Sequence, residues 1–431
     1  MRTPGNTPEV TTLSEELAIN GGPKARTAPF PSVGNSSGRD LGDEEIALLT
    51  EVVRSGCLGR HGGKMVPQFE QEYAGHQGVK HCLGVTSGTA ALHTAVGALQ
   101  LNPGDEIITT TITDMGTVIA ILQQNQIPIF CDVDRRTMNL DPARLEALIN
   151  DRTRAVIAVH LFGQACDMDA LMPIARKRNL YVIEDCAQAH DAEWDGRRVG
   201  TIGDLGCFSL QQSKQITTGD GGIVISNSDE LADNARSFHD KFYDRSGENR
   251  GVLRLGVNYR MTELQGAVAL AQTRKLDSIL GRRRHTAELL TSHLQEIEGL
   301  KPPWVHPKAT HSYWIYPIQI DEAALGCTVA DFRAAIQAEG LPWGTGYAGG
   351  IPICMYPALR EHKAYGNSLF PWEPPYGRYV EYREEDYPET VWAQANTFVM
   401  NWNEGITDGD VEDMAHGFRK VAEYYRERLG H

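Results

Sequence analysis

Short apolar runs alternate along residues 81–185 with segments in which apolar residues recur every three or four positions. The runs have the length of strands, and the periodic segments have the spacing of helices that bury one side. We predict strands over residues 81–86, 105–111, 127–133, 154–162 and 180–184, and helices over residues 88–100, 115–124, 142–150 and 168–178. Strands that are apolar on both faces indicate a mostly parallel sheet with helices on both sides. The sequence therefore predicts an α/β protein whose ligand lies at the carboxyl ends of the strands.

The rest of the chain is predicted to form an arm, a bridge and a second domain. Glycine and proline punctuate residues 1–40, which indicates an irregular arm, and helices are expected over residues 43–53 and 66–73. A helical pattern from residue 262 to about residue 297, with a break near Gly281, leads into the second domain. There we expect a strand over 313–320, a helix over 329–339, a long loop over 344–388 and a last helix from Thr407, with Asp410 as its capping partner.

These elements predict three parts: an arm over residues 1–40, a large α/β/α domain over residues 41–275, and a smaller α+β C-terminal domain over residues 276–431. The formal charge of −15 argues against a nucleic-acid or anionic-membrane surface. The start, from Met1 to Glu16, lacks the apolar stretch of a signal peptide, and no apolar run is long enough to span a bilayer. Eight scattered cysteines without Cys-x-x-Cys spacing predict free thiols in a reducing cytoplasm.

One lysine lies in a polar loop between two predicted strands. The strand from Cys207 to Leu210 leads to Lys214, and a turn over residues 219–222 leads to a strand over residues 223–226. A lysine held between strands beside small and hydroxyl residues suits a Schiff base with a carbonyl cofactor. A solvated lysine in a hairpin is the alternative that this loop alone leaves open.

A second candidate joins a strand to a helix at Ser87-Gly88-Thr89-Ala90. Free amides and the dipole at the start of a helix favour a phosphate, Gly88 allows close approach of the backbone, and Thr89 adds a hydroxyl. The segment is neither a Walker loop nor a dinucleotide fingerprint, because no Gly-Lys-Ser and no Gly-x-Gly-x-x-Gly is present. A plain helix cap by Ser87 or Thr89 explains the residues equally well.

A third candidate ends a buried strand with two acids, Glu184 and Asp185. An adjacent cation, such as a protonated pyridine nitrogen, would keep Asp185 ionised and lower its pKa by ~1–3 units. Glu184 is expected on the other side of the strand in a structural role. Gln188 could bond the phenolic oxygen of such a ring, and His190 could touch a substrate. The alternatives are a helix cap for Asp185, a surface amide for Gln188 and a buried histidine with no substrate contact for His190.

The order and spacing of these motifs resemble the DegT/StrS-type sugar aminotransferases, pyridoxal-phosphate enzymes of the aspartate aminotransferase fold (fold type I). The resemblance covers residues from about 18 to about 430 and rests on four segments: 87–90, 184–190, 208–222 and 256–261. It implies that Lys214 holds the cofactor and moves a proton, and that Asp185 pairs with the ring nitrogen. It further implies contacts to the ring hydroxyl and the phosphate from Gln188, Gly88, Thr89, Ser209 and, across a homodimer interface, Asn258.

The chain departs from the family pattern at the residue that stacks on the cofactor ring. The family usually has an aromatic residue there, whereas this chain has Asp114. The loss of a ring stack costs only ~0.5–1.5 kcal/mol, so cofactor binding should survive. Met115 could fill the space.

The resemblance implies amino transfer in two halves, with glutamate or glutamine as the donor and pyridoxamine 5′-phosphate as the form that carries the amine. A ketone on a sugar, nucleotide-linked or free, or on a cyclitol would receive it, in amino-sugar, aminocyclitol or antibiotic biosynthesis. Substrate contacts are expected from His160, His190 and Tyr313, and from loops at residues 241–254 and 347–376. Arg245, Arg250 and Arg254 of the first loop could meet a substrate phosphate or form a solvated face.

Three rival functions remain. The first is a dehydratase or isomerase that acts on a sugar ketone with the same cofactor. Relatives with histidine at the lysine position act as dehydratases, which Lys214 argues against. A regulator that kept the fold without catalysis would not need the lysine, the aspartate and the phosphate segment together. A metal hydrolase would need a cluster of His, Asp or Glu at ligand spacing, which the sequence pattern does not contain.

Overall fold

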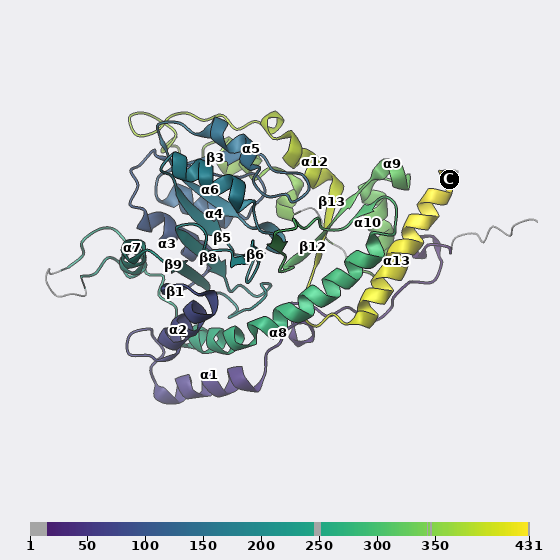
Figure 1. The fold of residues 1–431 in the computed structure, drawn as a ribbon, viewed down its shortest axis with the longest axis horizontal. Helices are drawn as coiled ribbons and strands as arrows, with labels where there is room; N and C mark the ends of the chain where they lie inside the picture. Colours follow the sequence, from purple (N-terminus) through teal and green to yellow (C-terminus); the bar gives the residue numbers. More distant parts are fainter. Residues whose placement is uncertain (1–14, 245–250, 343, 345–346, 430–431) are drawn as a thin grey trace, which may run out of the picture.

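The computed structural model describes residues 15–244, 251–342, 344 and 347–429. A seven-stranded sheet forms its centre, in the spatial order β1-β9-β8-β5-β4-β2-β3 (Figure 1). The strands are β1 (His81–Val85), β2 (Glu106–Thr110), β3 (Ile127–Cys131), β4 (Thr153–Val159), β5 (Tyr181–Asp185), β8 (Leu205–Ser209) and β9 (Gly222–Ser226). Strand β9 is antiparallel to both neighbours, and the other pairs are parallel. The predicted mostly parallel sheet is confirmed.

Helices cover both faces of this sheet. One layer contains α3 (Gly88–Ala98), α4 (Met115–Gln123) and α7 (Asp229–His239), and the other contains α2 (Met65–Gln77), α6 (Met168–Lys177) and the first part of α8 (Glu263–Leu294). Successive residues of one strand belong to different cores: Ile107 lies in the core that includes Leu92 of α3, while Ile108 lies in the core that includes Phe69 of α2. This alternation follows from the pleat of the strand and produces the predicted three layers.

Most predicted elements of the large sheet region are present, with ends that differ by a few residues. The helix predicted over residues 142–150 is shorter, because α5 (Pro142–Leu145) gives way to a 3-10 turn at Glu146–Leu148. Helix α7 was missed, although its signals are present in the sequence. Ser228 caps its start by accepting a hydrogen bond from Leu231 N, and two acids stand in the first turn.

The predicted helix break near Gly281 is wrong. Helix α8 runs without interruption through this position. Buried residues on both sides, Leu280 and Arg283, hold the helix against its neighbours, and this packing overrides the poor helix propensity of one glycine. The predicted boundary between residues 275 and 276 falls inside this continuous helix, and the division into domains stays a prediction.

A second, three-stranded sheet lies at the C-terminal end of α8. Its antiparallel strands are β10 (Leu300–Lys301), β12 (Ile315–Ile320) and β13 (Thr397–Asn401). Helices α10 (Val329–Ala338) and α13 (Asp408–Glu427) pack on it through a core that includes Phe332, Phe398 and Phe418. Thr407 and Asp410 form the predicted capping box of α13.

The predicted long loop contains short elements that the sequence did not reveal. They are 3-10 turns at Tyr347–Gly350, Ile353–Met355 and Glu384–Asp386 and the helix α11 (Pro357–Arg360), and they lead to α12 (Pro388–Asn396) and β13. The remaining elements are helix α9 (Glu322–Leu325) and a small sheet of β6 (Glu193–Trp194), β7 (Arg197–Arg198) and β11 (Ala309–Thr310).

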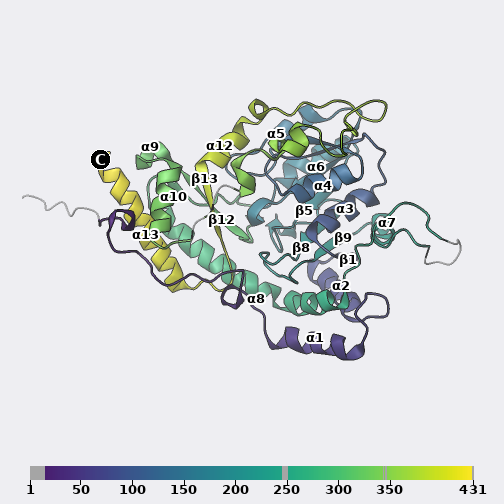
Figure 2. The same cartoon turned by 180° about the vertical axis from the view of Figure 1, so that it is seen from behind.

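The described part of the arm, residues 15–42, connects the two sheet regions. It contains only 3-10 turns at Ala18–Asn20 and Ser36–Gly38 before α1 (Asp43–Ser55) begins. It runs from beside α13 to α1 and passes close to α8 in both views (Figures 1 and 2). Asn403 anchors it by donating to the carbonyl oxygen of Pro31 over 2.9 Å.

All eight cysteines are free, and six of them are buried. Within the described residues, no helix combines the length and the apolar character needed to cross a membrane.

Candidate active site

A cavity of about 380 Å³ opens at the carboxyl ends of the central strands. Ser87 lies just beyond β1, Asp185 ends β5, and Ser209 ends β8; all three line the cavity. Strands β1, β8 and β5 point the same way, so their ends meet at one edge of the sheet. This is the edge at which the strand order predicts a ligand.

Lys214 extends into this cavity from the loop between β8 and β9. Its Nζ lies 3.5 Å from the centroid of the Trp314 ring. Burial lowers the pKa of Lys214 from 10.5 to about 8, although the nearby carboxylates of Asp185 and Asp114 oppose the shift. An amine with such a pKa is partly neutral near pH 8 and can act as a nucleophile. The alternative of a hairpin lysine surrounded by bulk solvent is wrong.

Asp185 supplies a buried carboxylate to the same cavity, with only 4% of its surface exposed. Its Oδ2 accepts a hydrogen bond from Thr117 Oγ1 at 2.8 Å, and its Oδ1 accepts one from Ala187 N at 3.1 Å. Burial raises the pKa of Asp185, and these hydrogen bonds offset only part of the effect. The described residues give this carboxylate no ion-pair partner, so the site has room for a ligand cation beside it.

The start of α3, where the sequence predicts a phosphate site, lies at the cavity wall. Ser87 caps the helix by accepting from Ala90 N at 3.0 Å, which confirms the helix-cap alternative for this residue. Gly88 and Thr89 follow as the first helical residues and line the cavity with Ser209. A Cβ on Gly88 would stand 2.7 Å from Cβ of Ser209, so only glycine allows this close approach. Free helix amides beside two hydroxyl groups suit a phosphate.

These donors fit pyridoxal 5′-phosphate. An anion cradle, a lysine of lowered pKa and a buried carboxylate without a cation line one cavity. They match the phosphate, the aldehyde and the basic ring nitrogen of that cofactor.

Gln188 is a cavity residue and not a surface amide. Only 4% of its surface is exposed. Its Oε1 accepts from Phe162 N at 2.7 Å, and its Nε2 donates to the hydroxyl of Tyr347 at 2.7 Å. These two bonds fix the orientation of the amide at the cavity wall. A contact with the ring hydroxyl stays a prediction.

The predicted substrate contacts of His160, His190 and Tyr313 are wrong, because none of the three lines the cavity. Within the described residues His160 binds Glu184 and Cys166 N, at 3.0 and 2.9 Å. His190 uses its nitrogens for the hydroxyl of Tyr73 and the carbonyl of Ser209. Tyr313 is buried in the core of the small sheet and stacks on His311.

Glu184 has the structural role expected from its place on the strand. Its oxygens accept hydrogen bonds from the backbone amides of Gly200, Ile202 and Gly203 and from His160. The fold brings the possible metal-ligand atoms of His160, Glu184 and Cys186 within 4.8 Å of one another. Their spacing in the sequence does not reveal this grouping. Because the carboxylate and the histidine already have these partners, this group is a hydrogen-bonded brace of the sheet edge. A second such grouping consists of the partly buried His76, the buried Asp191 and the exposed Asp277.

Asp114, at which the chain departs from the family pattern, is part of the cavity wall. Asp114 caps α4 by accepting from Gly116 N at 2.8 Å. The suggestion that Met115 fills the stacking space is wrong, because its side chain packs against the core formed with α2. Tyr347, the first residue of the loop predicted to contact substrate, lines the cavity. The sequence did not single out Thr117 or Trp314 as cavity residues, and for Trp314 no local signal identifies a role.

Asn258 is exposed and does not line the cavity of its own chain. Its predicted role requires a second subunit and therefore stays a prediction. Of the predicted arginine loop, Arg245 and Arg250 lie outside the described residues, whereas Arg254 is exposed.

Comparisons with known proteins agree with this geometry. The chain is 35% identical over 434 residues to a putative L-glutamine:3-amino-2,3-dideoxy-scyllo-inosose aminotransferase of Micromonospora echinospora, with 97% of this chain and 99% of the relative covered. It is 38% identical over 261 residues to the GDP-perosamine synthase of Caulobacter vibrioides, covering 60% of this chain and 70% of the relative.

Among solved structures, DesV of S. venezuelae superposes with a TM-score of 0.79 at 27% identity, covering 93% of this chain and 99% of the other. This similarity confirms the α/β fold of type I. Residues 39–419 match the DegT/DnrJ/EryC1/StrS aminotransferase family. The chain belongs to that family and is a pyridoxal-phosphate-dependent aminotransferase.

Proposed function

We propose that this enzyme moves an amino group from glutamine or glutamate to a ketone on a cyclitol or a sugar. The observation that carries the proposal is the single cavity that Lys214, Asp185 and the start of α3 share. The relatives support the substrate class, because their names specify an aminated scyllo-inosose and a GDP-linked amino sugar.

Pyridoxal phosphate supplies the electron-withdrawing ring that makes a proton on the amino-bearing carbon acidic. Lys214 is proposed to hold the cofactor and, once its Nζ is free, to move that proton. An amine with a pKa of about 8 can accept and return a proton near neutral pH. Asp185 is proposed to hold a proton on the ring nitrogen, and the amides and hydroxyls at Gly88, Thr89 and Ser209 to bind the phosphate.

The other cavity residues suit a substrate with several hydroxyl groups. Hydroxyl side chains of Thr113, Ser213 and Tyr347 line the cavity together with the carboxylates of Asp114 and Asp220. These groups can donate to and accept from ring hydroxyls, and the carboxylates favour a neutral or amine-bearing ring over an anionic one near the reacting carbon. Lys214 is the one cationic side chain among the described residues of the cavity wall.

We further propose that the active unit is a homodimer and that it works in the cytoplasm. Asn258 lies outside its own chain's cavity, which suits a contact to the phosphate across the interface. Eight free cysteines are typical of a reducing compartment.

A half-reaction assay tests the proposed function. The pyridoxamine phosphate form of the enzyme is mixed with 3-amino-2,3-dideoxy-scyllo-inosose, with scyllo-inosose or with a GDP-linked keto sugar, and recovery of the pyridoxal form is followed by absorbance. We expect recovery with at least one of these ketones and none with a polyol that lacks a ketone. Water loss from a sugar without amine transfer would instead identify the dehydratase alternative.

A further inference from the structure

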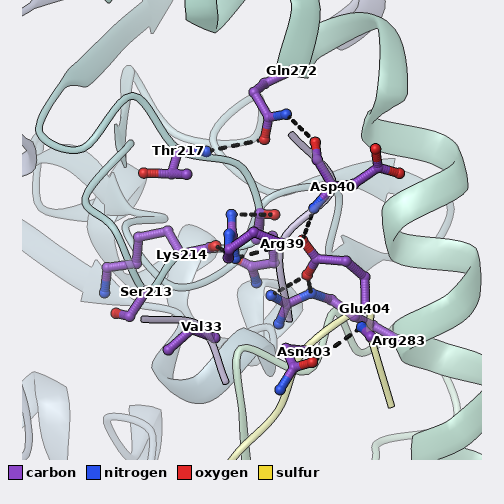
Figure 3. Close-up of polar contacts among 12 residues, drawn as sticks. Val33, Arg39, Asp40, Ser213, Lys214, Thr217, Gln272, Arg283, Asn403 and Glu404 are labelled. Carbon is purple, nitrogen blue, oxygen red and sulfur yellow. Dashed lines mark hydrogen bonds and ion pairs between the residues drawn. The ribbon is translucent and has the colours of Figure 1, made fainter. Parts of the chain in front are cut away.

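A buried arginine of the N-terminal arm contacts the main chain of Lys214. Arg39 Nη1 donates to the carbonyl oxygen of Lys214 at 2.8 Å, and Nη2 donates to that of Gln215 at 3.3 Å. The side chain of Lys214 points away from Arg39, toward the cavity (Figure 3). The planar guanidinium therefore clamps two successive carbonyl groups at the lysine without reaching the cavity.

This arginine belongs to a buried charge network with the small sheet region. Its Nη1 lies 3.7 Å from Glu404 Oε1, and the same carboxylate pairs with Arg283 at 2.8 Å. All three side chains are at most 1% exposed. Burial lowers the pKa of Arg39, and Glu404 opposes the shift. A buried charge network is costly relative to apolar packing, so simple space filling does not account for it.

The backbone around Arg39 is pinned from two sides. A Cβ on Gly38 would stand 2.6 Å from the carbonyl oxygen of Ser32 and 2.9 Å from Asn403 Oδ1. Only glycine therefore lets the arm pack this closely against itself and against Asn403. On the other side Gln272 of α8 donates to Asp40 O at 2.7 Å (Figure 3). Arg39 is thus held at a fixed place relative to both the small sheet and α8.

We propose that Arg39 is a positioning residue for Lys214. By fixing the carbonyl groups at residues 214 and 215, it sets the position from which the lysine side chain enters the cavity. The inference rests on the proposed role of Lys214 as the residue that binds the cofactor. A displacement of about 1 Å at a reacting group can cost about 100-fold in rate, which is the scale on which such a clamp acts.

Three variants test the clamp. Arg39→Gln removes the charge and the two guanidinium donors. Arg39→Lys keeps the charge near Glu404 but cannot donate to both carbonyl groups in the same way. Arg26→Gln is the matched control, because Arg26 anchors the same arm to Asp410 and Asp413 of α13 and does not touch the lysine loop. The main readout is the rate at which apo-protein captures pyridoxal phosphate on Lys214, trapped with borohydride and located by mass spectrometry. The pH midpoint of the lysine-bound absorbance band and the thermal midpoint are measured beside it.

We expect Arg39→Gln to slow capture about 10- to 100-fold and to shift the pH midpoint. Arg39→Lys should slow capture about fivefold, the scale of one lost hydrogen bond, while it remains folded. Arg26→Gln should capture the cofactor like the wild type even if it melts earlier.

Wild-type behaviour of Arg39→Lys would overturn the positioning role, and this result decides the matter if Arg39→Gln does not fold. Equal slowing in Arg26→Gln would also overturn it, because general docking of the arm would then explain the effect. If the wild type itself traps no cofactor on Lys214, the proposed function fails instead of the positioning role.

Discussion

The hydroxyl of Thr117 donates a hydrogen bond of 2.8 Å to Oδ2 of Asp185, deep inside the cavity. The same hydroxyl lies 2.7 Å from that of Thr113 and accepts a hydrogen bond from it, because its own single proton goes to Asp185. Thr117 stands in the first turn of α4, so this helix, whose start Asp114 caps, orients the acid at the end of β5. The orientation of Asp185 therefore depends on an element far from it in sequence.

Thr117→Val should weaken cofactor binding while it preserves the shape of the side chain. A hydrogen bond to a charged group contributes about 1.5–3 kcal/mol, so the dissociation constant of pyridoxal phosphate should rise about 10- to 100-fold. Equilibrium binding followed by fluorescence measures the change. Thr109→Val is the control, because Thr109 is equally buried but donates to Ile157 O on the neighbouring strand. Equal weakening in both variants would contradict a specific role for Thr117.

Asp185→Asn should stabilise the apo-protein and impair the enzyme. Burial raises the pKa of Asp185 above 3.8, its ordinary value. The carboxyl group therefore contributes stability below pH 3.8, and this contribution is lost as the pH rises through the folded-state pKa. At pH 7 the apo form of Asp185→Asn should melt above the wild type, whereas its amino transfer should fall at least about 100-fold. Calorimetry of the apo-protein and single-turnover kinetics check the two parts separately.

Lys214→Ala should fold and bind the cofactor without a covalent bond, and it should not transaminate. In the wild type, borohydride trapping of the cofactor should accelerate as the pH rises through about 8, because Lys214 loses its proton there and not near 10.5. Lys80→Ala, which changes an exposed lysine, should keep both the trapping rate and its pH profile. Full turnover by Lys214→Ala would disprove the assignment of the lysine.

The large sheet and its ligand edge could be predicted because their signals are local. Strands such as the one ending at Asp185 are continuous apolar runs, and each helix that follows repeats its apolar face over several turns. The cradle at Gly88 and the loop at Lys214 each lie within one short segment, so spacing alone could indicate them.

The remaining parts of the site depend on contacts between distant segments. Trp314 reaches the cavity from beside β12, and Arg39 reaches the lysine loop from the arm. Their positions follow from the packing of β12 and α8, which no local pattern encodes. His160 was misjudged for the same reason: it follows β4 at the correct edge, but Glu184 and Cys166 N hold its ring away from the cavity.

The variant Glu184→Gln tests the structural role of this acid and leaves its neighbour Asp185 unchanged. Burial alone would raise the pKa of Glu184, but the bonds from His160 and the backbone amides outweigh it and lower the pKa. Glu184 therefore contributes stability above its ordinary pKa of 4.5, and this contribution is lost as the pH falls through the folded-state value. The variant should lose about 1–3 kcal/mol at pH 7, because its amide NH₂ faces backbone donors. Urea unfolding at pH 7 and at pH 4 measures this, and an unchanged free energy would contradict the brace.

Gly88→Ala should weaken phosphate binding through the close contact between α3 and β8. The added methyl group would stand 2.7 Å from Cβ of Ser209, so either the cradle widens or the start of α3 shifts. Overpacking of this kind costs about 1–3 kcal/mol, which corresponds to a rise of about 5- to 100-fold in the dissociation constant of pyridoxal phosphate. Pyridoxal, which has no phosphate, should lose much less affinity. Gly75→Ala is the control, because a methyl group there meets nothing within 4 Å. Equal losses for pyridoxal and its phosphate would show that Gly88 shapes the ring site and not the phosphate cradle.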